Sequence, residues 1–232
     1  MKFLTQEQFT EMWALQDSLN TATSGPDWTK RGQNWNLAIK SEIMEFFDYI
    51  GWKWWKEPSK TQKPSDMQAR LELVDIWHFL LSSIIEKSAI VGYTPEAIHK
   101  TCAGYAKVEP NSLEACAQAI KELDAYRISN YQKVTMLADA LQFCEWSWEE
   151  LYKAYIGKVA LNNFRQANGY KEGTYQKIWM VQRNDILPEP EYDEFEDNYF
   201  LEQIISELSL TEGALTYEAV YAKLGIEYML RC

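Results

Sequence analysis

Two pairs of carboxylates stand within segments that otherwise have the apolar pattern of buried helices. The first pair is Glu42 and Glu45, and the second is Glu72 and Asp75. Residues three apart lie on the same side of a helix, so each pair presents two carboxylates together. An ionised carboxylate away from water is costly unless it is paired or metal-bound, and adjacent carboxylates repel each other. We therefore expect at least one proton or cation among these groups.

The second pair is the more informative of the two, because almost every other residue from Leu71 to Leu81 is apolar. A helix that is apolar all round is a buried helix. Four carboxylates on two neighbouring helices would form an oxygen cage that suits hard divalent cations, Mg²⁺ or alternatively Mn²⁺. The plainer alternative is a set of surface charges at the rim of a core, and this fits the second pair less well than the first.

A basic cluster is the third candidate for chemistry. Lys158, Asn162 and Arg165 stand four and three residues apart, which places them on one face of a helix. Residues 168–179 follow with two glycines, which suit a loop that brings backbone and cations close to a ligand. Arg and Lys in such a setting are what a polyphosphate requires. The alternative is an ordinary amphipathic helix with a basic flank.

Helix signals dominate the segments that must position these residues. We expect helices that start at the Thr5–Gln8 capping box, span about 35–49, open at Ser65, start at Thr94, span 111–126 and 131–143, run from Ser147 to about 168, and close the chain near 195–208 and 216–230. Residues 170–180 are predicted to be a basic, aromatic connector, and residues 189–197 a solvated acidic linker.

The facing of the helix over 35–49 separates its acidic residues. Its apolar stripe includes Ile39, Ile43 and Phe46. Glu42 borders this stripe and Glu45 lies one step beyond it, so both flank the packing seam. Asp48 points the opposite way, and we expect it to be an ordinary solvated carboxylate.

Composition favours an all-α protein with a sizeable core. The chain has 232 residues, 47% of them hydrophobic, and only ten glycines and seven prolines, which leave little room for a turn-rich β fold. We expect a catalytic helical domain over 1–180, with 95–145 as an inserted or smaller helical part. An acidic linker and C-terminal helices are expected over 181–232.

Charge and cysteine usage narrow the class of protein. The net charge of −11 argues against nucleic acid as the main partner. Four widely spaced cysteines suggest reduced thiols in a cytoplasmic protein. The N-terminal residues carry no apolar signal region, and the apolar run from Ile76 to Ile85 is about half of a membrane span. We therefore expect no membrane association.

Taken together, these motifs resemble the dimeric, all-α dUTP pyrophosphatases, members of the all-α NTP pyrophosphatase superfamily. The matching segments are Leu15 to Asn20, Glu42-x-x-Glu45 followed by Trp52 to Lys56, Glu72-x-x-Asp75 followed by residues 76–79, and Lys158 through Trp179. The similarity departs after Trp179, where residues 180–185 lack the expected Asn-Gly turn. The motifs do not cover 95–145 or the chain beyond 190.

The resemblance implies a multi-helix bundle with a mobile C-terminal helical portion, a homodimer, and Mg²⁺-dependent hydrolysis of dUTP, and of dUDP, to dUMP. It assigns Mg²⁺ to Glu42, Glu45, Glu72 and Asp75, phosphate contacts to Lys158, Asn162, Arg165, Tyr170 and Lys177, uracil to Gln16 and Asn20 with Trp55 as an apolar wall, and a place near the deoxyribose to His78. Glu42 is predicted to orient or deprotonate the attacking water.

Two other functions remain open at this point. A sister enzyme could act on dCTP, because the amides of Gln16 and Asn20 can both donate and accept hydrogen bonds. A catalytically silent helical dimer could instead bind a protein partner through the tryptophans at 52–55 and the acidic tail. A third possibility concerns the amides alone, namely that Gln16 and Asn20 merely cap the end of a helix.

Overall fold

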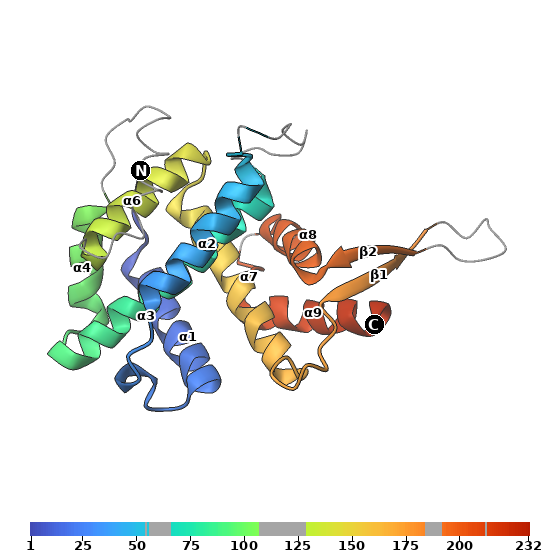
Figure 1. Cartoon of the computed structure of the whole chain (residues 1–232), viewed down its shortest axis with the longest axis horizontal. Coiled ribbons are helices and arrows are strands. Elements are labelled where there is room, and N and C mark those ends of the chain that lie inside the picture. Colours follow the sequence, from blue (N-terminus) through green and yellow to red (C-terminus); the bar gives the residue numbers. More distant parts are fainter. Residues whose placement is uncertain (54, 56–65, 107–128, 184–191, 212) are drawn as a thin grey trace. The chain divides into compact units, whose positions relative to one another are not determined.

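The all-α prediction is confirmed by the computed structural model, which describes residues 1–53, 55, 66–106, 129–183, 192–211 and 213–232. The helices are α1 (Gln6–Ser24), the short 3₁₀ turn η1 (Trp28–Lys30), α2 (Trp35–Ile50), α3 (Met67–Val91), α4 (Pro95–Tyr105), α6 (Asn130–Phe143), α7 (Trp148–Ala167), α8 (Asp197–Ser209) and α9 (Tyr217–Arg231) (Figure 1). The strands β1 (Ile178–Gln182) and β2 (Tyr192–Glu196) form a small antiparallel sheet.

The chain divides into two compact units. We call Met1–Tyr155 the N-terminal unit and Ile156–Cys232 the C-terminal unit. The boundary falls within α7, whose first eight residues therefore belong to one unit and whose remainder belongs to the other. The functional division expected near residue 180 is a different one, and it stays a prediction.

The core of the N-terminal unit is built around α2 and α3, which run antiparallel (Figure 1). The apolar stripe of α2 is buried, including Ile39, Ile43 and Phe46. The middle of α3 is buried on nearly all sides, as its continuous apolar sequence predicts. Where α2 begins and α3 ends, the Trp35 indole N–H donates to Glu86 Oε2 at 3.0 Å. This pairing fixes which turns of the two helices face each other.

Local capping explains where several helices begin. Thr5 and Gln8 form the predicted capping box of α1, and the Thr94 side chain caps α4 with Pro95 at its first position. At α3 the N-cap is Asp66, whose side chain accepts from the Gln68 backbone N–H at 2.9 Å. The predicted opening at Ser65 and the helix expected over 111–126 lie outside the described residues.

The β-hairpin of the C-terminal unit corrects the predictions for 178–180 and 192–196. These residues are paired strands, not a connector and a solvated acidic linker. Two acidic residues of β2 pair with basic residues that flank β1, because Lys177 lies 3.1 Å from Glu196 and Arg183 lies 2.5 Å from Asp193. Within the same unit Trp179 is fully buried and stacks on Phe200 of α8 with ring centroids 5.0 Å apart. These partners are distant in sequence, so local composition did not reveal them.

Neither a membrane-spanning helix nor a disulfide occurs in the described part of the chain. None of these helices combines the length and apolar character needed to cross a bilayer. Of the described cysteines, Cys102 and Cys144 are buried and Cys232 is exposed. Burial raises the pKa of the Cys102 thiol to about 12, so this cysteine is an unreactive core residue at neutral pH.

Candidate active site

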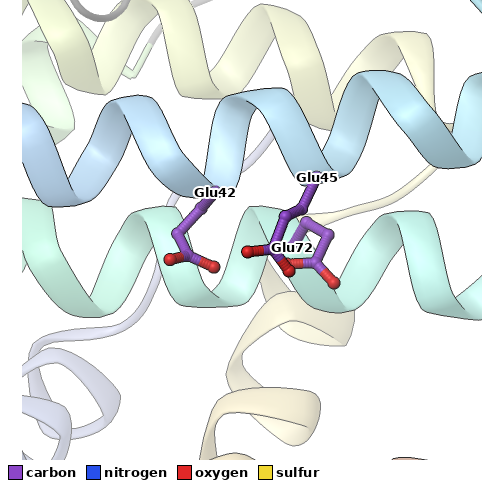
Figure 2. Close-up of side chains that lie close together, drawn as sticks. All are labelled: Glu42, Glu45 and Glu72. Atoms are coloured by element: carbon purple, nitrogen blue, oxygen red, sulfur yellow. The ribbon is translucent and has the colours of Figure 1, made fainter.

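An acidic cluster lies where α2 faces α3. It consists of Glu42, Glu45 and Glu72, which each place one carboxylate oxygen within 4.8 Å of the others (Figure 2). Glu42 is partly buried, Glu45 is exposed and Glu72 is only 5% exposed. The spacing of three brings Glu42 and Glu45 to the same side of α2, and the antiparallel packing brings Glu72 to them.

The chemistry of the acidic cluster suits a hard divalent cation. Three carboxylates at this separation repel one another, and the repulsion is relieved by a bound cation or by protonation. All three offer oxygen ligands, which Mg²⁺ and Mn²⁺ prefer. Asp75, one turn further along α3 and partly buried, lies outside this close group. The structure thus brings together three of the four carboxylates that were expected.

Asp48 differs from the prediction in one respect. It is outside the acidic cluster, and its side chain is 55% exposed. It is nevertheless not simply solvated: it accepts a hydrogen bond from the Trp52 indole at 3.0 Å and pairs with Lys53 at 2.5 Å. Asp48 therefore holds Trp52 and Lys53 at the end of α2.

A buried amide network forms a second part of the N-terminal unit. It consists of Gln16, Asn20, His78, Ser82 and Tyr155. Gln16 is 2% exposed, and its Oε1 lies 2.6 Å from His78 Nδ1 and 2.9 Å from the Tyr155 hydroxyl. Its Nε2 donates to Asn20 Oδ1 at 3.1 Å. The possibility that these amides merely end a helix is wrong, because α1 continues to Ser24.

Two members of the amide network were missed by the sequence reasoning. Tyr155 stacks on His78 with ring centroids 4.3 Å apart, and burial raises the pKa of its hydroxyl well above the usual value. It therefore remains a hydrogen-bond donor at all ordinary pH values. Ser82 is fully buried in α3. A hydroxyl residue in the middle of an apolar helix was the available signal for Ser82, because buried polar groups need partners.

Trp52 and Trp55, which follow α2, lie near the surface. Trp55 is 55% exposed and meets Trp52 edge-on, with ring centroids 5.3 Å apart. Trp52 is itself tied to α2 through Asp48. An exposed aromatic face of this kind is available to a planar ligand, so the predicted role of Trp55 as an apolar wall stays a prediction.

The basic cluster of Lys158, Asn162 and Arg165 lies in the C-terminal unit, where Arg165 is paired with a buried carboxylate. Arg165 Nε and one terminal nitrogen donate to the two oxygens of Asp197 at 2.8 and 2.6 Å. Asp197 is fully buried, and it also accepts from the Tyr175 hydroxyl at 2.8 Å. The other terminal nitrogen of Arg165 lies 3.3 Å from Asn162 Oδ1. Asn162 and Arg165 are therefore in contact on α7, and Asp197 lies against Arg165.

The remaining predicted phosphate ligands vary in exposure. Lys158 is only 3% exposed, and its Nζ donates to Asn198 Oδ1 at 3.2 Å. Tyr170 is 49% exposed, and Lys177 pairs with Glu196 near the surface. Asp197 and Asn198, which the sequence reasoning missed, begin α8. Their only advance signal was their place at the end of an acidic run, directly before an apolar helix.

Comparison with known proteins places these residues in a family context. The sequence profile of the dUTPase family matches residues 8–170, well over half of the 232-residue chain. The matched range contains both carboxylate pairs, the amide network and the basic cluster. A search of curated proteins found no match.

Proposed function

The chain belongs to the dUTPase family, and from that premise we propose that it hydrolyses dUTP to dUMP and pyrophosphate at a site that includes the acidic cluster. A dUTP diphosphatase activity is what membership of the family implies. The observation that supports the placement of the site is the convergence of Glu42, Glu45 and Glu72 within 4.8 Å. No other arrangement among the described residues gathers three carboxylates in this way.

The chain's own carboxylates would hold Mg²⁺, with Mn²⁺ as a substitute. Glu42, Glu45 and Glu72 provide the close group, and Asp75 is added by resemblance. When bound, the ion supplies Lewis-acid stabilisation of the negative charge on the phosphate oxygens. Glu42 would orient the attacking water and accept its proton, a role that suits a partly buried carboxylate within the cluster.

The basic cluster would contact the phosphates, together with Tyr170 and Lys177. Arg165 can serve this role while paired with Asp197. A guanidinium has five N–H groups; two of them donate to Asp197 and one lies toward Asn162 Oδ1, so these contacts hold the side chain in a fixed orientation. We infer that Asp197 and Asn198 support the basic cluster.

The base and sugar would be bound by residues of the N-terminal unit. Gln16 and Asn20 would meet the uracil edge, Trp55 would cover its face, and His78 would lie near the deoxyribose. The buried, hydrogen-bonded state of Gln16 and Asn20 supports a site that is organised before the substrate binds. The homodimer and the cytoplasmic location, implied by the resemblance and by the cysteine spacing, are part of this proposal.

A pyrophosphate-release assay tests the proposed function. We expect turnover of dUTP with Mg²⁺ or Mn²⁺ and none in excess chelator, with dCTP and dTTP as much poorer substrates. Hydrolysis of dUDP to dUMP would show that the γ-phosphate is not required, and transfer of the oxygen of labelled water into dUMP would place the attack at the α-phosphorus. Full activity in chelator would disprove the metal assignment, and a preference for dCTP would identify the sister activity instead. Light scattering of the purified chain tests the homodimer.

A further inference from the structure

The hydrogen bonds of the amide network are anchored at one backbone carbonyl. The carbonyl of His78 can only accept, and Ser82 Oγ lies 2.8 Å from it, so the single hydroxyl hydrogen of Ser82 is donated there. Ser82 Oγ also lies 2.9 Å from the Asn20 side-chain amide. Because its hydrogen is already used, Ser82 can only accept from Asn20. Asn20 must therefore turn its Nδ2 toward Ser82 and its Oδ1 away.

The orientation of Asn20 determines that of Gln16. Asn20 Oδ1 faces the Gln16 amide at 3.1 Å, so Gln16 must offer its Nε2 there. Its Oε1 then faces His78 Nδ1 at 2.6 Å and the Tyr155 hydroxyl at 2.9 Å. An amide oxygen only accepts, so His78 carries a hydrogen on Nδ1. The two amide orientations and the histidine tautomer thus follow from the donor and acceptor inventory alone.

This arrangement restricts what Gln16 can offer to a ligand. Its carbonyl oxygen faces His78 Nδ1 and the Tyr155 hydroxyl, whose single hydrogen is shared between Gln16 Oε1 and the Met12 carbonyl 3.0 Å away, and one Nε2 hydrogen faces Asn20. The contacts within the described residues do not use the second Nε2 hydrogen of Gln16, so this is the group that Gln16 can offer to a ligand. Gln16 can therefore present an N–H group to a base. Uracil presents carbonyl oxygens on either side of its N–H, whereas cytosine has an amino group in place of one of them.

We propose that Ser82 is a positioning residue for base selection. Its hydroxyl, held by the His78 carbonyl, orients the amides of Asn20 and Gln16 so that the site accepts a pyrimidine carbonyl and rejects an amino group. This inference rests on the proposed function, in which Gln16 faces the base of dUTP. The fixed orientation of the two amides distinguishes dUTP from dCTP, whereas two amides that could turn freely would bind either base. A mismatched buried donor weakens binding by about tenfold to a hundredfold.

Substitution of Ser82 tests the proposal against a matched control. Ser82→Ala removes the acceptor that orients Asn20, so the ratio of kcat/KM for dUTP to that for dCTP should fall by about tenfold or more. Ser88→Ala is the control, because Ser88 is also buried in α3 and donates in the same way to the Ile84 carbonyl at 2.7 Å. We expect Ser88→Ala to leave the ratio unchanged. An unchanged ratio in Ser82→Ala would overturn the proposal.

The histidine tautomers give a test that does not depend on activity. The chain has two histidines, and His99 Nε2 lies 2.9 Å from the Leu4 carbonyl, which can only accept. Nitrogen NMR at about pH 8, where histidine is ordinarily neutral, should therefore show His78 protonated on Nδ1 and His99 on Nε2. A hydrogen on Nε2 of His78 would overturn the proposed orientation. If the wild-type protein did not hydrolyse dUTP, the proposed function would be wrong, but the tautomer result would still support the orientation of the amides.

Discussion

The acidic cluster of the N-terminal unit and the basic cluster of the C-terminal unit handle charge in opposite ways. In the acidic cluster, carboxylates of like charge converge within 4.8 Å. In the basic cluster, Arg165 is matched by the fully buried carboxylate of Asp197. Like charges favour an additional cation, whereas a buried ion pair is balanced within the chain. The acidic cluster therefore points to a bound cation, whereas the Arg165–Asp197 pair of the basic cluster stabilises the fold.

This difference predicts opposite effects of charge removal on stability. Neutralising a carboxylate of the acidic cluster relieves repulsion while removing a metal ligand. Neutralising Asp197 leaves the nearly buried guanidinium of Arg165 without its counter-charge. Neutralising a carboxylate of the acidic cluster should therefore lower activity without lowering stability. Neutralising Asp197 in the C-terminal unit should lower both.

The largest effect is expected from Glu72→Gln. Turnover of dUTP with Mg²⁺ should fall by about a hundredfold or more, because a buried ligand of the cation is lost. The melting temperature should stay the same or rise. Glu86→Gln, on the same helix and outside the acidic cluster, is the control and should keep its activity, since Gln can still accept from the Trp35 indole. A destabilised but active Glu72→Gln would contradict the comparison.

The next effect is expected from Asp197→Asn. Breaking a buried ion pair by neutralising one partner costs about 3–5 kcal/mol of unfolding free energy. Urea denaturation measures this loss. Asp193→Asn removes the same kind of carboxylate from the exposed Arg183 pair in the hairpin, and it should leave the stability almost unchanged. Equal effects of the two substitutions would show that burial does not decide the strength of these pairs.

A smaller effect is expected from Tyr175→Phe, which removes one hydrogen bond to Asp197. The loss should be about 1–3 kcal/mol, typical of a bond to a charged group. Burial, and then the charge of Asp197, raise the pKa of Tyr175 above the usual tyrosine value of about 10. The stability contribution is therefore full below pH 10 and falls as the pH rises further, because the unfolded chain loses that proton first. Denaturation at neutral and alkaline pH should show a weaker alkaline loss in the variant.

The smallest effect is expected from Asp48→Asn. Its contacts with Trp52 and Lys53 are exposed, so the change in unfolding free energy should be at most about 1 kcal/mol. Glu45→Gln, three residues earlier on α2, should instead weaken Mg²⁺ binding. Metal titration of both variants measures the difference. Similar losses of metal affinity would show that Asp48 also takes part in metal binding.

The helices were predictable because their signals are local. A capping box such as Thr5–Gln8 and the apolar period of α2 involve residues within a few positions of each other. The hairpin was not predictable in this way. Its acidic strand resembles a solvated linker until the basic residues across the ladder are known. Strand pairing depends on a partner segment that local composition does not reveal.

The sequence by itself determined the helices and the faces on which Glu42, Glu45 and the basic cluster lie, because helical periodicity links residue types three and four apart. The tertiary structure decided which groups became partners. It joined Glu72 to the α2 carboxylates, while Asp75 stayed outside the group. It oriented Asn20 through Ser82, 62 residues away, and paired Arg165 with Asp197, 32 residues away. The physical reason is that hydrogen bonds and ion pairs act over a few ångströms in space, and only folding sets those distances.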